Sequence, residues 1–205
     1  VRSKICGITC IKDALAASQL GADAIGLVFY AQSPRAVSIA QAEEITAASP
    51  PFLTTVGLFV NADPAWVQDV LAHVPLNTLQ FHGDETEKYC QQFNKPYIKA
   101  IRIKHEDTAD SVQRKVDLYT SASGILLDTF SPQMYGGTGD VFDWSIIPNN
   151  CSSPVLLAGG LTPENLSAAL EQSQPYAVDV SGGVEQAKGI KDVEKMQAFL
   201  SLCRK

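Results

Sequence analysis

Two side chains that can take or give a proton end apolar stretches that lie far apart in the chain. Cys6 ends the stretch KIC and precedes Gly7, and Asp128 ends the stretch GILLD. A thiolate is a base, and a carboxyl partly withdrawn from water favours the protonated form that a general acid needs. The alternatives are structural: a small buried hydrophobe for Cys6 and a turn cap for Asp128. Lys4 precedes Cys6 on the same strand face, where its charge can stabilise a thiolate.

Two glycine-rich junctions follow the last apolar stretches. Gly159 and Gly160 follow LLA, and Ser181, Gly182 and Gly183 follow AVDV. Glycine leaves backbone N–H groups uncovered, and such groups bind anions, particularly near a helix N-terminus. A single Gly-Gly pair more often makes only a tight turn. Because both junctions follow the last two strands of the pattern described below, they predict a phosphate site made by Gly159, Gly160, Ser181 and Gly182.

Three further polar side chains lie at such junctions. Arg35 follows Ser-Pro and can bind a carboxylate with its planar fork, or else form a surface ion pair. His82 in LQFHGDE can carry a proton or orient a ligand. Asp179 in AVDV can bind ligand hydroxyls or orient the phosphate loop. Arg102, at the end of another apolar stretch, is expected to be structural.

The spacing of apolar residues predicts the elements that position these groups. Strands are expected over 2–6, 23–29, 53–60, 76–81, 97–103, 123–128, 154–158 and 176–180, and helices over 10–20, 38–48, 63–73, 85–93, 108–118, 142–147, 162–171 and 191–203. The strands are near-continuous apolar runs, typical of parallel strands covered on both faces. Eight strand–helix units predict an α/β fold, a single-domain (β/α)8 TIM barrel over residues 1–205. A doubly wound sheet is the alternative, but CGIT after the first strand lacks the GxGxxG spacing.

The connections between these elements carry their own signals. The predicted helix starts are Asn61 or Asp63 ahead of a proline, Asp84 in the fourth helix and Thr162 in the seventh. The loop 129–141 is unusually long and contains three glycines. Long loops of this kind often cover an active site, so this loop is a predicted lid.

Composition narrows the class of protein. The formal net charge of −6 argues against a general nucleic-acid binder. No apolar stretch is long enough to cross a bilayer, and no basic-then-apolar leader is present, so no membrane association is expected. The five cysteines are scattered and, with the three histidines, form no metal-ligand spacing: Cys6, Cys10, Cys90, Cys151 and Cys203. A reduced, cytoplasmic protein without a metal is expected.

The ordered set of junctions resembles the phosphoribosylanthranilate isomerase family. The resemblance runs nearly end to end and rests on KICGIT, GLVF with SPR, VGLFVN, LQFHGDE, LLDT with GGTG and FDW, LLAGGLTPENL and DVSGGVE. It implies a (β/α)8 barrel that needs no cofactor or metal. The implied reaction is an Amadori rearrangement in tryptophan biosynthesis, in which the aminoaldose N-(5-phosphoribosyl)anthranilate becomes an aminoketose.

The same resemblance implies a role for each junction residue. Asp128 matches the general acid that opens the furanose ring, and Cys6 matches the general base that takes the C2 proton. Arg35 would bind the anthranilate carboxylate. The two glycine-rich junctions would bind the phosphate, and His82 and Asp179 would line the substrate pocket. A monomer is expected.

Two other classes of protein are the alternatives. One is a different phosphate-binding barrel enzyme, but an indole-glycerol-phosphate synthase would supply lysines and glutamates at the strand ends, and a pentose-phosphate epimerase would supply metal ligands. The other is a non-catalytic barrel that senses a phosphorylated metabolite, which would need neither Cys6 nor Asp128. The related histidine-pathway aminoaldose is a possible second substrate, although it carries two phosphates and the sequence indicates one phosphate site.

Overall fold

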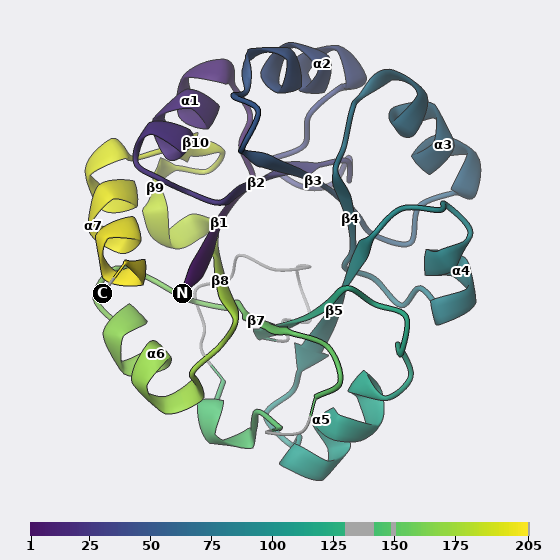
Figure 1. Ribbon diagram of the computed structural model, residues 1–205, viewed down its shortest axis with the longest axis vertical. Coiled ribbons are helices and arrows are strands. Elements are labelled where there is room, and N and C mark those ends of the chain that lie inside the picture. Colours follow the sequence, from purple (N-terminus) through teal and green to yellow (C-terminus); the bar gives the residue numbers. More distant parts are fainter. Residues whose placement is uncertain (130–141, 149–150, 205) are drawn as a thin grey trace.

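The computed structural model describes residues 1–129, 142–148 and 151–204, and within them eight parallel strands close into a barrel (Figure 1). The strands are β1 Arg2–Cys6, β2 Ala24–Val28, β3 Thr54–Phe59, β4 Thr78–Phe81, β5 Tyr97–Ile103, β6 Gly124–Thr129, β7 Val155–Leu157 and β8 Ala177–Val180. Each strand pairs with the next along the chain, and β8 pairs with β1. The predicted barrel is confirmed, and its closure excludes the doubly wound sheet.

Seven α-helices of the described chain surround the barrel in Figure 1. They are α1 Ile11–Gln19, α2 Ile39–Ala48, α3 Pro64–His73, α4 Glu87–Gln91, α5 Ala109–Val116, α6 Leu166–Ser173 and α7 Val193–Cys203. The carboxylate of Asp63 accepts a hydrogen bond from the N–H of Ala65 and caps α3, so Asp63 is the cap and Asn61 is not.

Two predicted helix starts are wrong. Asp84 does not open α4, because the hydroxyl of Thr86 caps that helix and the Asp84 carboxylate instead binds Arg102 at 2.8 Å. Arg102 therefore has the structural contact expected of it. Thr162 does not open α6, because the chain makes a further turn before the helix and the N-cap residue is Asn165. The side chain of Asn165 accepts from the N–H of Thr162 and so tightens that turn.

The helix expected over 142–147 is also wrong. Residues 142–148 contain one 3-10 turn, η1 Trp144–Ile146, capped by Asp143. The next residue, Ile147, has an extended backbone (φ −67°, ψ 122°), as expected for a residue that precedes a proline, here Pro148. The predicted lid loop falls almost entirely on residues 130–141, which lie outside the described residues.

A small hairpin that the sequence did not predict follows β8. It consists of the 3-10 turn η2 Gly182–Val184 and the antiparallel strands β9 Glu185–Ala187 and β10 Ile190–Lys191. Figure 1 places the hairpin beside α7 and α1, at the edge of the barrel formed by β1 and β8. The hairpin brings two charged residues, Glu185 and Lys191, to this edge.

Aromatic side chains form part of the core between the strands and the helices. The rings of Phe29 and Phe59 stack with their centroids 5.3 Å apart, and Phe81 lies 6.3 Å from Phe59. Phe59 and Phe81 are completely buried. Each aromatic residue buries a large apolar area, so these rings stabilise the packing of neighbouring strands under the helices.

A buried ion pair holds the loop between β4 and α4. The Lys99 ammonium lies 3.0 Å from a carboxylate oxygen of Glu85 and also donates to the carbonyls of Phe81 and Gly83. Glu85 in turn accepts from the N–H groups of Asn61 and Gly83. The backbone on both sides of residue 82 is therefore fixed.

We predict that Phe59→Ala destabilises the fold far more than Phe52→Ala. Removing a fully buried phenylalanine leaves a cavity and costs about 3–5 kcal/mol of the free energy of unfolding. Phe52 is 97% exposed, so its loss is expected to change that free energy by less than about 0.5 kcal/mol. Urea unfolding followed by far-UV circular dichroism measures both, and equal losses would contradict the assignment of Phe59 to the core.

Candidate active site

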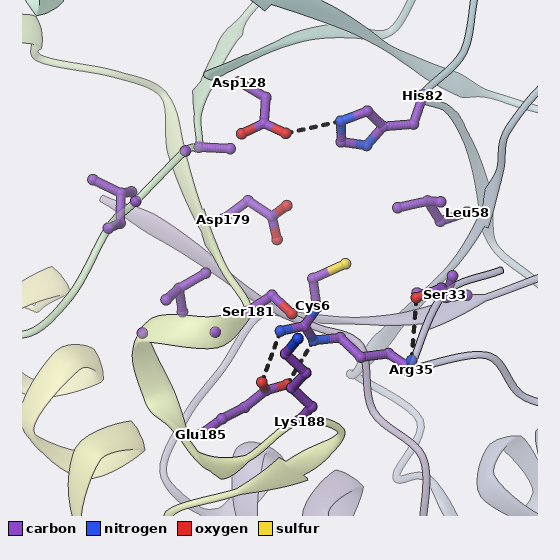
Figure 2. A pocket seen from close by; sticks show the side chains of 18 of the residues that line it. Cys6, Ser33, Arg35, Leu58, His82, Asp128, Asp179, Ser181, Glu185 and Lys188 are labelled. Carbon is purple, nitrogen blue, oxygen red and sulfur yellow. Dashed lines mark hydrogen bonds and ion pairs between the residues drawn. The ribbon is translucent and has the colours of Figure 1, made fainter. Parts of the chain in front are cut away.

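A pocket of about 460 Å³ opens at the carboxyl ends of the strands. Its size is in the range of sites for small organic ligands. All nine predicted site residues line it: Cys6, Arg35, His82, Asp128, Gly159, Gly160, Asp179, Ser181 and Gly182. Figure 2 shows Cys6 and Asp128 at separate places on its wall, with Asp179 between them.

Cys6 ends β1 with its thiol directed into the pocket (Figure 2). On the neighbouring strand β2, Gly26 makes room for it: a Cβ atom at Gly26 would lie 2.7 Å from the Cys6 Sγ and 3.1 Å from the Lys4 Nζ. Burial raises the pKa of the Cys6 thiol above its ordinary value of 9.0. Lys4 lowers this pKa and Asp179 raises it, so the thiol is protonated in the resting protein at neutral pH.

Lys4 and Asp179 form a buried ion pair beside Cys6. Their residues are directly opposite each other where β1 pairs with β8, and the Lys4 Nζ donates to Asp179 at 2.9 Å. Burial by itself lowers the pKa of Lys4, but the charges of Asp179 and Cys6 outweigh burial and raise it, so Lys4 is a cation. Lys4 therefore provides the predicted positive charge near Cys6, and the carboxylate of Asp179 partly neutralises that charge.

Asp128 lies near the end of β6 and contacts His82, which follows β4. The His82 Nε2 lies 2.9 Å from the Asp128 Oδ2, and both side chains are buried. The other oxygen, Oδ1, has no hydrogen-bond partner in the part of the chain that the structure describes. Gly159 leaves space around it, because a Cβ atom there would lie 3.0 Å from Oδ1. One oxygen of Asp128 is thus held and the other is open to a ligand.

Arg35 is buried and its fork is already engaged. Its Nε and Nη2 donate to the two oxygens of Glu185 at 2.7 and 2.8 Å. The alternative of a surface ion pair is wrong, because Arg35 is only 7% exposed. Gly7, which has φ +74°, makes room for the arginine: a Cβ atom there would lie 2.5 Å from the Arg35 Cδ. Both hydrogens of Nη1 and the second hydrogen of Nη2 are left for a carboxylate ligand.

Glu185 joins Arg35 to a second cation. The Lys191 Nζ lies 2.9 Å from Glu185 and donates to the carbonyl of Ser181 at 3.2 Å. Burial tends to raise the pKa of Glu185, but Arg35 and Lys191 outweigh it and lower the pKa, so Glu185 is a carboxylate. The ion pairs of Glu185 with Arg35 and Lys191 therefore hold the hairpin β9–β10 against the pocket.

The two glycine-rich junctions lie against each other at one side of the pocket. Gly159 and Gly160 have φ values of +84° and +63°, which only glycine adopts readily. Gly183 packs so closely on the carbonyl of Leu161 that any side chain there would collide with it. This packing brings the backbone of residues 159–162 and 181–183 to a common wall of the pocket, as the phosphate prediction requires.

Several residues of this site were missed by sequence reasoning. Gln80 donates to His82, Glu185 and Lys191 form the charged cluster under Arg35, and Lys188 lines the pocket. The signal for Gln80 was available, because it lies two residues before His82 and so faces the same side of the strand. For Glu185 there was none, since its partner Arg35 is 150 residues away in the chain.

The described residues contain no group of three or more His, Cys, Asp or Glu side chains that could hold a metal ion. Nor does any helix among them have the length and apolar character needed to cross a membrane.

The comparison with protein families is decisive. Residues 3–201 match the family model described as N-(5'-phosphoribosyl)anthranilate (PRA) isomerase. The chain belongs to the phosphoribosylanthranilate isomerase family. An N-(5'-phosphoribosyl)anthranilate isomerase of Pseudomonas fluorescens (strain SBW25) is 60% identical over 204 residues, which cover 100% of this chain and 96% of that protein.

Solved structures of this isomerase family have the same fold. The crystal structure of phosphoribosyl anthranilate isomerase from Thermotoga maritima superposes with a TM-score of 0.90 at 39% identity, covering 100% of this chain and 98% of that one. A crystal structure of the isomerase in complex with reduced 1-(o-carboxyphenylamino)-1-deoxyribulose 5-phosphate superposes with a TM-score of 0.84 at 37% identity, with the same coverage.

We predict that Lys4→Met and Asp179→Asn shift the titration of the Cys6 thiol in opposite directions. Alkylation by iodoacetamide requires the thiolate, so in the wild type its rate is expected to rise through a midpoint above pH 9.0. Loss of the Lys4 cation moves this midpoint to higher pH, and loss of the Asp179 carboxylate moves it to lower pH.

Peptide-resolved mass spectrometry separates Cys6 from the other four cysteines. The exposed Cys10 is the internal control, whose alkylation neither substitution is expected to change. Shifts of Cys6 in the same direction in both variants would show that Lys4 and Asp179 do not act through their charges.

Proposed function

We propose that this protein catalyses the Amadori rearrangement of N-(5-phosphoribosyl)anthranilate to 1-(2-carboxyphenylamino)-1-deoxyribulose 5-phosphate in tryptophan biosynthesis, by general acid–base catalysis. As a member of its family it is an aldose–ketose isomerase, an intramolecular oxidoreductase. The observation that carries the mechanism is that Cys6 and Asp128 reach one pocket that is also lined by both glycine-rich junctions. No cofactor enters the proposed reaction.

The first step is ring opening by Asp128. The carboxyl gives a proton from Oδ1 to the furanose ring oxygen, and the C1–O bond breaks. The nitrogen lone pair forms a C1=N bond, which gives a protonated Schiff base. The geometry supports this role because Oδ2 is held by His82 whereas Oδ1 faces the space above Gly159. A positioned acid of this kind lowers the barrier of the transition state in which the bond breaks.

The second step is proton removal by Cys6. The thiolate takes the proton from C2, and the C–H electrons form a C1=C2 bond while the nitrogen recovers its lone pair. The resulting enolamine loses its O2 proton and gains a proton at C1, which gives the ketone. The iminium group acidifies the C2–H bond, so a modest base suffices. Its positive charge also favours the thiolate, which the resting pocket holds mainly as thiol.

The remaining contacts bind the two ends of the substrate. The phosphate is proposed to lie on the backbone of Gly159, Gly160, Ser181 and Gly182. Lys191, which donates to the Ser181 carbonyl, adds positive charge at this end. The anthranilate carboxylate is proposed to bind the remaining N–H groups of Nη1 and Nη2 of Arg35. These two nitrogens can still form a bidentate contact, and Glu185 fixes the guanidinium in place before the substrate arrives.

His82 and Asp179 are proposed to act beside the substrate. His82 holds the carboxyl of Asp128, and Asp179 balances the charge of Lys4 next to Cys6. In this proposal neither residue exchanges a proton with the substrate. The cytoplasmic location expected from the scattered cysteines, all five of them free, belongs to the same proposal.

We predict that Cys6→Ser and Asp128→Asn each lower kcat by about 10²–10⁴-fold, because each removes a group that moves a proton in the transition state. The substrate is generated from anthranilate and phosphoribosyl pyrophosphate by the preceding transferase, and the loss of its fluorescence is followed.

The matched controls are Cys10→Ser and Asp69→Asn, which make the same chemical changes at exposed positions. Both controls are expected to keep wild-type kcat. An inactive wild type would reject the isomerase and favour a sensor of a phosphorylated metabolite. Activity that survives both pocket substitutions would keep the isomerase and reject this acid–base pair.

We predict that the protein is a monomer in solution, because every group that the mechanism uses comes from one chain. Size-exclusion chromatography with light scattering, at the concentration of the activity assay, is expected to give the 22.0 kDa of a single chain. A mass of about twice this value would reject the monomer and leave the mechanism unaffected.

A further inference from the structure

Gln80 lies two residues before His82 and is not among the residues that line the pocket. Gln80 belongs to β4 and is completely buried, and His82 directly follows this strand. The amide Nε2 of Gln80 lies 3.0 Å from the His82 Nδ1. The amide Oε1 has no hydrogen-bond partner in the described chain, and the residues beside Gln80 in the sheet are the apolar Leu58 and Ile98. In the described chain, the side chain of Gln80 therefore has one hydrogen-bond partner, His82.

The contact with Gln80 determines where His82 carries its proton. An amide NH2 group only donates, so the Nδ1 of His82 must accept and cannot carry a hydrogen. A neutral imidazole has one hydrogen, which is then on Nε2. A doubly protonated imidazolium would direct an N–H at the NH2 group of Gln80 and is disfavoured. His82 is thus a neutral imidazole of one defined tautomer.

The tautomer of His82 in turn determines which oxygen of Asp128 can carry a proton. The His82 Nε2 lies 2.9 Å from Oδ2, so its N–H donates to that oxygen and a hydrogen on Oδ2 is excluded. The acidic proton of Asp128 is confined to Oδ1, the oxygen next to Gly159. Because His82 is neutral, it also does not trap Asp128 as the carboxylate of an ion pair, as a histidine cation would.

We propose that Gln80 is a positioning residue that, through the tautomer of His82, places the acidic proton of Asp128 on the oxygen that faces the substrate. This inference rests on the proposed isomerase reaction and assigns a function to a residue outside the set that contacts the substrate. Gln80 touches neither the reacting atoms nor Asp128 itself. Its whole effect passes through one hydrogen bond to His82.

The first test is nitrogen-15 NMR of the ligand-free protein near neutral pH. The chain has three histidines, and the exposed His73 and His105 are internal references for rings on the surface. We expect His82 to give an unprotonated Nδ1 and a protonated Nε2. A protonated Nδ1 in the wild type, whether in a neutral ring or in an imidazolium, would overturn the proposal.

The second test compares Gln80→Met with Gln80→Glu. Methionine has a similar size and no donor, so it leaves the tautomer of His82 unspecified, and kcat is expected to fall on the order of tenfold. Glutamate presents an acceptor to Nδ1 and favours the imidazolium, which holds Asp128 as a carboxylate. For Gln80→Glu we expect a loss of about 10²-fold or more in kcat, as for a missing general acid, with Nδ1 protonated in the NMR spectrum.

The two tests distinguish failure of this inference from failure of the proposed function. In Gln80→Met, KM is expected to stay within about twofold of wild type, because the substrate contacts are intact. A rise in KM with unchanged kcat, or full activity in a folded Gln80→Met variant, would overturn the role of Gln80 while the isomerase stands. An inactive wild type with the expected His82 tautomer would reject the isomerase alone. Thermal unfolding of each variant identifies any that fails to fold.

Discussion

The pairing of β8 with β1 closes the barrel, and the contacts across the pocket depend on this closure. It places Lys4 opposite Asp179, residues 175 positions apart in the chain, and so supplies the charges around Cys6. It also places the hairpin that follows β8 close to β1. In this position Glu185 forms its ion pair with Arg35 from the loop after β2. Parallel strands have their carboxyl ends at one rim, which is why groups from β1, β4, β6, β7 and β8 meet in a single pocket.

Three buried ion pairs lie around the pocket. Lys4 with Asp179, Lys99 with Glu85 and Arg35 with Glu185 are all nearly inaccessible to solvent. Such pairs contribute little net stability, because each charge loses its hydration, but breaking one partner of a pair is strongly destabilising. Their consequence is precise placement: each pair fixes a backbone turn or a side chain that borders the pocket.

Sequence reasoning located the barrel and the pocket because both follow from local patterns. Apolar runs specified the strands, and the residues after each run, such as Cys6 and Asp128, had to meet at one rim. It failed where structure depends on distant partners. The hairpin after β8 was not predicted, so the buried ion pair of its Glu185 with Arg35 was not predicted either. The expected helix over 142–147 failed because apolar residues alone do not distinguish a helix from one short turn before a proline.

The burial of Cys6 has a consequence beyond proton transfer. Peroxides oxidise cysteine through its thiolate, and the pocket keeps the resting thiol protonated and 6% exposed. The oxidisable form is therefore scarce in the resting protein, and in the proposed reaction it forms only when a cationic intermediate lies against the sulfur. If Cys6 is the base of the proposed reaction, this arrangement preserves it in its reduced state between turnovers.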